Sequence, residues 1–554
     1  MLLFKYGKVV ISLVIFFAVL AILGIPFFDW GFINDDYGFL LYSQLKSVRD
    51  IFYLFAPHDI GHAFNPSNYH SIPLTFGSAL YRPMQFVLFG LESWLLGINP
   101  YALLLCVISL HALISVALFN IFAVFFGMPL AFFGAMFFAL HPTLEHWIGV
   151  FTCQIYIIDV LYLLGAAYLL KCYLDSKKLG WYVLSCSIMT LSIFAKETLI
   201  IFPVWAMAAT MFYCSLTQGE ALMLYAGRAL RVSLGYWAGA LFYLMVRASL
   251  FPFSSGSAGA SSLKQVTDAF IARQKERLGD WISYVCDYLY VGLVPSGNRL
   301  LKGGLVVVLI SFLVWPFIAR KQYKELAFLV GSILLFTWPA WLLFYQPRYL
   351  YIGLPFFFGI VLCAASYYLV FFTTSKRYCY IVLCFLLAAN AGAFAFRQRT
   401  KEAVLNTILC AFKELATNQV IYDKAVWFVG LPAHWFGSGN AQALWLLGSN
   451  AERMPVFYNM GTFFFKTEPF YDIKPHRMTA AIKDGCLELR SHDPENLFFY
   501  KNLSINNPQS PLVFSEKNSR QEATVVSMPL DMFAQQQDLV IVTWDYENQK
   551  FLII

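Results

Sequence analysis

Two adjacent acids, Asp35 and Asp36, lie a few residues beyond the first long apolar run of the chain, which extends from Val9 to Phe28. Carboxylates at the mouth of a membrane span are costly to desolvate, and they usually mark a reaction or transport site. Such an acid can serve as a general base or bind a metal ion. The pair is therefore the first candidate for chemistry in this sequence.

Basic residues stand at three further places. Arg348 opens the motif Arg348-Tyr349-Leu350-Tyr351, Lys196 precedes Glu197, and an arginine occupies the centre of Tyr81-Arg82-Pro83. The planar fork of an arginine suits a phosphate, because it donates two hydrogen bonds and keeps its charge. Each position also has a plainer interpretation. Arg348 and its tyrosines can anchor a span, Lys196 and Glu197 can form a snorkelling ion pair, and Arg82, like Arg247, can contact lipid headgroups.

The sequence also contains two histidine motifs. His141-Pro142 with Glu145 follows the third apolar run, where a proline is compatible with a helix end and an acid with a solvated side chain. His58 and His62 have the i, i+4 spacing of a zinc-binding helix. Pro57 and Gly61 argue against a helix there, so the sequence does not favour zinc hydrolysis.

The composition sets the class of protein that must position these residues. Hydrophobic residues make up 59% of the chain and charged residues only 13%, which is far from the norm for soluble domains. The chain is therefore expected to be a polytopic α-helical membrane protein. Its net charge of +7 comes from short loops between apolar runs, where membrane topology explains it. Nucleic-acid binding gains no support.

The apolar runs predict about 11 transmembrane helices. The runs cover residues 9–28, 101–126, 128–140, 149–170, 181–195, 199–215, 232–246, 303–319, 326–344, 350–373 and 379–396. A twelfth stretch, Met84 to Leu96, contains Glu92 and has the length of an interfacial helix. With eleven spans the lysine- and arginine-rich loops fall on the cytoplasmic side, as the positive-inside rule requires.

This topology gathers the candidate residues on the external face. The transmembrane domain then covers residues 1–397, with an external loop at 29–100 that holds the acids and juxtamembrane helices. A second external loop, 251–302, has a flexible start and an amphipathic continuation, which suggests a lid.

Residues 398–554 are predicted to form an extracytoplasmic soluble α/β domain, because they are polar and contain no run long enough to span. Strands are expected at Val426–Leu431, Ala523–Met528, Leu539–Trp544 and Phe551–Ile554, the last two forming a hairpin.

The chain resembles the GT-C membrane glycosyltransferases over about residues 1–400. The likeness is nearest to the tetratricopeptide-bearing transmembrane O-mannosyltransferases and their bacterial relatives, and more distant to protein O-mannosyltransferases and aminoarabinose transferases. It rests on five short motifs and their order: Asp35-Asp36, Tyr81-Arg82-Pro83, His141-Pro142 with Glu145, Lys196-Glu197 and Arg348-Tyr349-Leu350-Tyr351. The chain lacks the 34-residue helical repeat. It also lacks an Arg-x-Asp that follows the histidine motif in the family; Cys153, Gln154 and Ile155 occupy that stretch, and Asp159 comes later.

The resemblance implies an enzyme that moves a sugar, a hexose such as mannose, from a polyprenyl-phosphate donor to a hydroxyl of a protein, lipid or glycan on the extracytoplasmic side. Asp35 or Asp36 would be the general base, and the other acid would orient the acceptor or bind a divalent cation. No cofactor is otherwise required. The implied donor-phosphate ligands are Arg348, Lys196 and Arg82, and the implied sugar or acceptor ligands are His141, Glu145, Glu197, Tyr349 and Tyr351.

Three alternatives stay open at this point: a transporter or flippase for lipid-linked glycans, a ligase or polymerase for whole glycans, and an inactive scaffold. Acids near the membrane surface and the absence of an evident inverted repeat favour an enzyme over a carrier. The expected location is a bacterial inner membrane with the site facing the periplasm, and the alternative is the endoplasmic reticulum membrane.

Overall fold

The computed structural model describes, with short gaps, residues 2–25, 81–218, 225–250, 299–337, 347–371 and 380–395. It also describes residues 48–55, a few residues just before them, Glu414, and the strands that follow. The acids Asp35 and Asp36, Glu145 and the predicted lid up to residue 298 lie outside the described residues.

The chain divides into two compact units. The first comprises Met1–Phe28, Ser78–Leu88 and Ala102–Gln398, and the second comprises Asp29–Gly77, Phe89–Tyr101 and Arg399–Ile554. The candidate residues that the structure describes all belong to the first unit.

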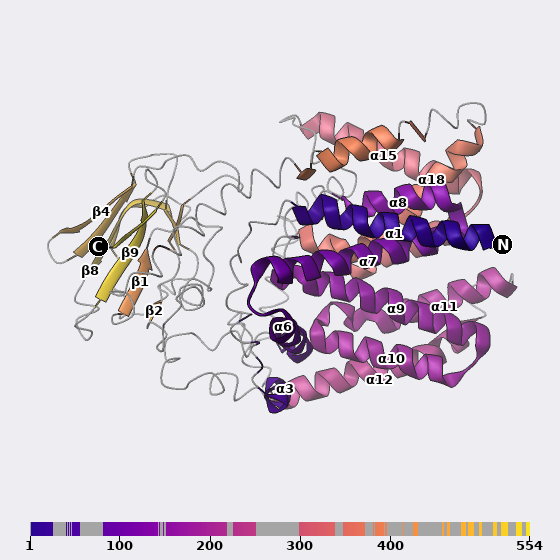
Figure 1. Cartoon of the computed structure of the whole chain (residues 1–554), viewed down its shortest axis with the longest axis horizontal. Coiled ribbons are helices and arrows are strands. Elements are labelled where there is room, and N and C mark those ends of the chain that lie inside the picture. Colours follow the sequence, from indigo (N-terminus) through magenta and orange to yellow (C-terminus); the bar gives the residue numbers. More distant parts are fainter. Residues whose placement is uncertain are drawn as a thin grey trace. The chain divides into compact units, whose positions relative to one another are not determined.

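Helices that run side by side build the first unit (Figure 1). The long ones are α1 (Leu2–Gly24), α7 (Pro100–Phe126), α8 (Met128–Ala139), α9 (Gln154–Ser176), α10 (Leu179–Ala195), α11 (Phe202–Gln218), α12 (Ala226–Leu250), α15 (Arg299–Ala319), α16 (Tyr323–Phe336) and α18 (Leu354–Phe371). Three short 3₁₀ segments lead into α9, α11 and α18: η3 (Phe151–Cys153), η4 (Glu197–Ile201) and η8 (Pro347–Gly353). Every one of the eleven predicted apolar runs overlaps a described helix.

Six helical stretches of the described residues are long and apolar enough to cross a membrane, so the chain is a multi-pass membrane protein. They are Tyr6–Gly24, Pro100–Phe126, Phe151–Ser176, Glu197–Thr217, Ala226–Leu250 and Arg348–Val370. Shorter apolar helices occur at Met128–Ala139, Leu179–Ala195, Gly304–Ala319 and Leu383–Gly392. The total of eleven spans stays a prediction.

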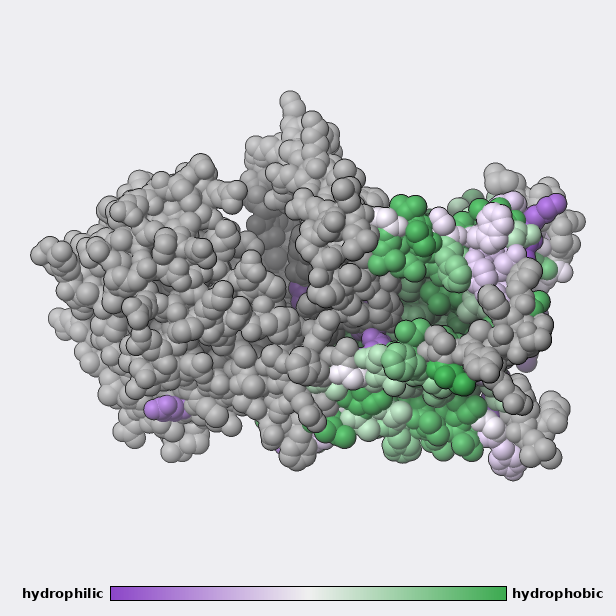
Figure 2. Space-filling view, turned by 90° about the horizontal axis from the view of Figure 1, so that it is seen from above, coloured by the Kyte–Doolittle hydropathy of each residue, from purple (hydrophilic) through white to green (hydrophobic). Residues whose placement is uncertain are grey.

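The outer surface of these helices is hydrophobic, as Figure 2 shows for one face. Large apolar side chains such as Phe17, Leu241 and Val307 are exposed there. A contiguous apolar outer surface is typical of lipid-facing helices.

Helix α6 (Pro83–Leu96) covers the predicted interfacial stretch, Met84 to Leu96, and begins one residue earlier. Its 14 residues extend over about 21 Å, which is less than the ~30 Å hydrocarbon core of a bilayer. Pro83 opens the helix, where its missing N–H costs nothing. Tyr81 and Arg82 are therefore the two residues directly before the helix.

Helix α12 packs closely on α10 through two glycines, Gly235 and Gly239. The Tyr182 hydroxyl of α10 donates a hydrogen bond to the Val232 carbonyl (2.8 Å) and accepts one from the Gly235 N–H (2.9 Å). A Cβ atom on Gly235 would lie 2.5 Å from the same hydroxyl oxygen. Small residues four apart allow helices in membranes to approach this closely, and the close approach sets where Arg247 at the end of α12 meets the residues that follow α10.

The described residues beyond 424 form two sheets. Their strands are β1 (Ala425–Val429), β2 (Phe457–Tyr458), β3 (Phe463–Phe465), β4 (Met478–Lys483), β5 (Cys486–Ser491), β6 (Phe498–Tyr500), β7 (Val513–Lys517), β8 (Glu522–Pro529), β9 (Leu539–Asp545) and β10 (Lys550–Ile553). One sheet has the order β10-β9-β1-β2, and the other has β3-β6-β8-β5-β4 with β7 beside β8. The four predicted strands overlap β1, β8, β9 and β10, and the hairpin of β9 with β10 is confirmed. The α/β class of the domain stays a prediction. The second unit also holds the short helix α3 (Val48–Phe55).

We expect Gly235→Ala to lower the stability of the protein, because its methyl group must displace a tyrosine hydroxyl that is held by two backbone hydrogen bonds. Overpacking of this kind typically costs ~1–3 kcal/mol. Thermal unfolding of the purified protein in detergent measures the loss. Gly227→Ala is the matched control on the same helix, since a Cβ there meets open space. Equal melting temperatures for the two variants would contradict the packing described here.

Candidate active site

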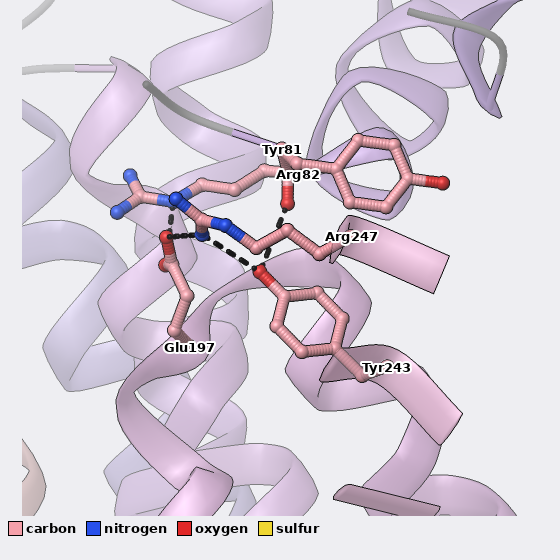
Figure 3. Close-up of polar contacts among 5 residues, drawn as sticks. All are labelled: Tyr81, Arg82, Glu197, Tyr243 and Arg247. Carbon is pink, nitrogen blue, oxygen red and sulfur yellow. Dashed lines mark hydrogen bonds and ion pairs between the residues drawn. The ribbon is translucent and has the colours of Figure 1, made fainter. Parts of the chain in front are cut away.

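Glu197 lies between the two arginines Arg82 and Arg247 (Figure 3). Its Oε2 atom is 2.8 Å from Nε of Arg82, and its Oε1 atom is 3.4 Å from Nη1 of Arg247. The same Arg247 nitrogen donates to the Tyr243 hydroxyl at 3.2 Å, and that hydroxyl donates to the Tyr81 carbonyl at 3.3 Å. The carboxylate thus ties α12 and the residues before α6 to the start of α11.

The backbone at Lys196 explains how two neighbouring residues reach different partners. Helix α10 ends at Ala195, and Lys196 adopts an extended conformation with φ −163° and ψ 136° before η4 begins at Glu197. Consecutive side chains point to opposite sides of extended backbone. Glu197 therefore faces the two arginines while Lys196 faces α9, and the ion pair between these two neighbours, which the sequence left open, is not formed.

Lys196 is buried, with only 3% of its surface exposed. Its Nζ atom lies 2.8 Å from the centroid of the Tyr156 ring and 5.4 Å from that of Tyr349, an arrangement in which ring faces attract a cation. Burial lowers the pKa of this ammonium well below its usual value, an effect that the Asp159 carboxylate partly offsets. An arriving anion would favour the charged form.

Arg348 approaches the same ring from η8. Its Cζ atom is 5.6 Å from the Tyr156 centroid, and its Nη1 atom is 3.6 Å from Sγ of Cys153. The neighbouring Tyr349 meets Tyr156 edge to face, with the ring centroids 5.6 Å apart. The Tyr156 ring thus contacts both Lys196 and Arg348 and places the two side chains next to each other.

The charges of this cluster do not balance among the residues that the structure describes. Two acids, Asp159 and Glu197, are accompanied by three guanidiniums, those of Arg82, Arg247 and Arg348, and by the amine of Lys196, which an anion would help to charge. For Arg82, burial alone would lower the pKa of the guanidinium, but the Glu197 carboxylate more than offsets it and the pKa is raised. An excess of fixed positive charge in a site poor in water is suited to binding an anion.

The structure places two other predicted residues apart from this cluster. His141 is fully buried, its Nδ1 atom lies 2.9 Å from the Thr143 hydroxyl, and its ring meets Phe358 edge to face. Tyr351 is also buried, and its hydroxyl lies 2.7 Å from Nδ1 of His111. The predicted binding roles of both residues stay predictions.

The cluster brings together five of the predicted residues: Arg82, Lys196, Glu197, Arg348 and Tyr349. Tyr156, Asp159 and Tyr243 had no role predicted from the sequence, and for Arg247 only contact with lipid headgroups was predicted. Two spacings could have revealed them. Tyr156 and Asp159 are three apart near the start of α9, and Tyr243 and Arg247 are four apart near the end of α12, so each pair shares a helix face.

No three His, Cys, Asp or Glu side chains are grouped as a metal site within the described ranges. The divalent cation considered for Asp35 or Asp36 concerns residues outside those ranges.

Neither a protein-family model nor a curated protein matches the sequence. Among solved structures, the Archaeoglobus fulgidus oligosaccharyltransferase in complex with zinc and sulfate is similar at 13% identity and a TM-score of 0.46, over 81% of this chain and 62% of that one. The present chain thus spans less than two thirds of that protein. ArnT from Cupriavidus metallidurans bound to undecaprenyl phosphate is similar at 12% identity and a TM-score of 0.43, over 79% of this chain and 84% of that one. These TM-scores are too low to assign a family, so the function has to be inferred from the chain's own residues.

We expect Glu197→Gln to destabilise the protein by ~1–3 kcal/mol, because two partly buried guanidiniums lose their shared counter-charge. Denaturant unfolding in detergent measures the change. Asp175→Asn is the control, since Asp175 forms an exposed ion pair with Lys171 on α9, and exposed pairs contribute at most ~1 kcal/mol. An effect of Glu197→Gln no larger than that of the control would show that the paired arginines do not depend on this carboxylate.

Proposed function

We propose that the chain is a GT-C-like glycosyltransferase that moves a sugar from a polyprenyl-phosphate donor to an acceptor hydroxyl on the extracytoplasmic face of a membrane. The observation that carries this proposal is the cation-rich cluster built by Arg82, Lys196, Arg247 and Arg348 at one end of a bundle of apolar helices. A lipid-linked phosphate combines the two properties that such a site fits, a long apolar chain and an anionic headgroup.

Basic residues at the opposite end of the same helices support an orientation in which the cluster faces the extracytoplasmic side. Lys171 pairs with Asp175 near the end of α9, and Lys324 at the start of α16 donates to Ser215 near the end of α11. Arg320, between α15 and α16, stacks on Tyr367 with its Cζ atom 4.9 Å from the ring centroid. Clusters of Lys and Arg in short loops are typical of the cytoplasmic side, which supports the proposal that the candidate active site faces the extracytoplasmic side.

The cluster can supply stabilisation for the leaving group. As the bond between the sugar C1 and the phosphate oxygen breaks, negative charge grows on the lipid phosphate. Arg348 and Lys196, fixed against one tyrosine ring, can donate hydrogen bonds to that phosphate with little rearrangement, and Arg82 adds a third positive charge nearby. Preorganised donors of this kind stabilise a transition state more strongly in a site that excludes water.

The acceptor side of the reaction needs a base. In this proposal Asp35 or Asp36 removes the proton of the acceptor hydroxyl as its oxygen attacks C1, a contribution typically of ~10²–10⁴ in rate. The other acid orients the acceptor or binds a divalent cation. The proposed sugar or acceptor ligands are His141, Glu145, Glu197, Tyr349 and Tyr351. The transferred sugar is proposed to be a hexose, mannose included, and the acceptor a protein, lipid or glycan facing the periplasm.

The test is release of radiolabelled sugar from undecaprenyl-phosphate hexoses in membranes that contain the wild type or a variant. We expect Arg348→Ala to lower turnover ~10²–10³-fold, since it removes one preorganised donor to the leaving phosphate. Either Asp35→Asn or Asp36→Asn should lower it ~10²–10⁴-fold, since one of the two acids is the base.

Arg320→Ala is the matched control, because Arg320 also stacks on a tyrosine but lies at the other end of the helices. Its turnover should equal that of the wild type. A wild type that binds the lipid donor but releases no sugar with any extract of acceptors would contradict the transferase and favour a carrier.

A further inference from the structure

Two ionisable side chains in the cluster, one acid and one base, are buried without hydrogen-bond partners among the described residues. Asp159, in the second turn of α9, is 1% exposed and Lys196 is 3% exposed. Among the described residues, neither oxygen of the Asp159 carboxylate forms a hydrogen bond, and the Nζ atom of Lys196 forms none either. The Thr198 hydroxyl lies beside the carboxylate but does not meet hydrogen-bond geometry.

These two groups attract each other, yet no ion pair joins them. Helix α9 holds Asp159 in place. Lys196, whose backbone is extended at the end of α10, has its side chain against the Tyr156 ring. A buried carboxylate without partners is costly. A site that holds such a carboxylate in place is suited to a ligand that supplies the missing donors.

The surroundings of Asp159 narrow the class of that ligand. A carboxylate is acceptor-only when ionised, so it repels a phosphate and needs a group that donates. A ligand ammonium would donate, but Lys196 and Arg82 already bring positive charge to the carboxylate and disfavour another cation. A neutral hydroxyl group donates without adding charge, and two adjacent hydroxyl groups can satisfy both oxygens.

We propose that Asp159 is a specificity-determining residue that accepts hydrogen bonds from hydroxyl groups of the transferred sugar. This inference rests on the proposed function and deepens it. Lys196, beside Asp159, spans the junction between the sugar and the phosphate, and Arg348 binds the phosphate alone. The substrate class is then a neutral, hydroxylated sugar on a polyprenyl phosphate, and a sugar that carries a free ammonium group is rejected.

Equilibrium binding to the purified full-length protein in nanodiscs tests this assignment with two kinds of probe. One is undecaprenyl phosphate without a sugar, and the other is a panel of undecaprenyl-phosphate mannose, glucose and galactose. Asp159→Asn should weaken binding of the preferred sugar-bearing lipid about 10- to 100-fold, as expected for lost hydrogen bonds to a charged acceptor. It should change binding of undecaprenyl phosphate less than about two-fold, which also shows that the variant is folded.

Two further variants make the outcome specific. Arg348→Ala should weaken both kinds of lipid, and Asp175→Asn, which alters the exposed acid at the other end of α9, should weaken neither. Equal weakening of both lipids by Asp159→Asn, or no weakening of either, would overturn the sugar-binding role while leaving the proposed transferase intact. A wild type that binds neither lipid would instead overturn the proposed function, and this inference with it.

A comparison on the wild type does not depend on any variant. The best neutral hexose on undecaprenyl phosphate should bind at least about 10-fold more tightly than the matching 2-amino-2-deoxyhexose with a free ammonium group, because a neutral donor adds no charge beside Lys196 and Arg82. Tighter binding of the amino sugar would overturn the choice of a neutral ligand.

Discussion

The candidate active site depends on one residue of extended backbone between two helices. Lys196 ends α10 and precedes η4, so the side chains of Lys196 and Glu197 leave the chain on opposite sides. Glu197 binds Arg82 and Arg247, while Lys196 lies on the Tyr156 ring beside Arg348. A regular helix through these positions could not serve both groups of partners, because neighbouring helical residues do not point in opposite directions.

This arrangement divides the charges into two parts with different roles. The pairing of Glu197 with two arginines joins the residue before α6 to α12 and the start of α11, and its geometry is fixed by charge-assisted hydrogen bonds. Lys196, Arg348 and Asp159 lie on the other side, where Tyr156 supplies a rigid wall. The Glu197 ion pairs hold neighbouring segments together, and the side chains of Lys196, Arg348 and Asp159 are the charged groups that a ligand can bind.

The sequence predicted the helical elements well because apolar runs of about 20 residues have few other solutions. Charges at the ends of apolar runs also drew attention to Arg82, Lys196, Glu197 and Arg348, which the structure brings into one cluster; their binding roles stay predictions. Tyr156, Asp159 and Tyr243 were harder to find, because aromatic and isolated polar residues inside an apolar helix acquire a role only when neighbouring helices are placed. The close packing of α12 on α10, which brings Arg247 to Glu197, is likewise a tertiary property.

The most direct test of the proposed phosphate site is an experimental structure of the full-length protein with bound undecaprenyl phosphate. We expect phosphate density within hydrogen-bond distance of Arg348 or Lys196, with the polyprenyl chain lying along the apolar outer surface of the helices. Phosphate density at the opposite end, near Arg320 and Lys324, or a headgroup that contacts none of the cluster's cations, would contradict it.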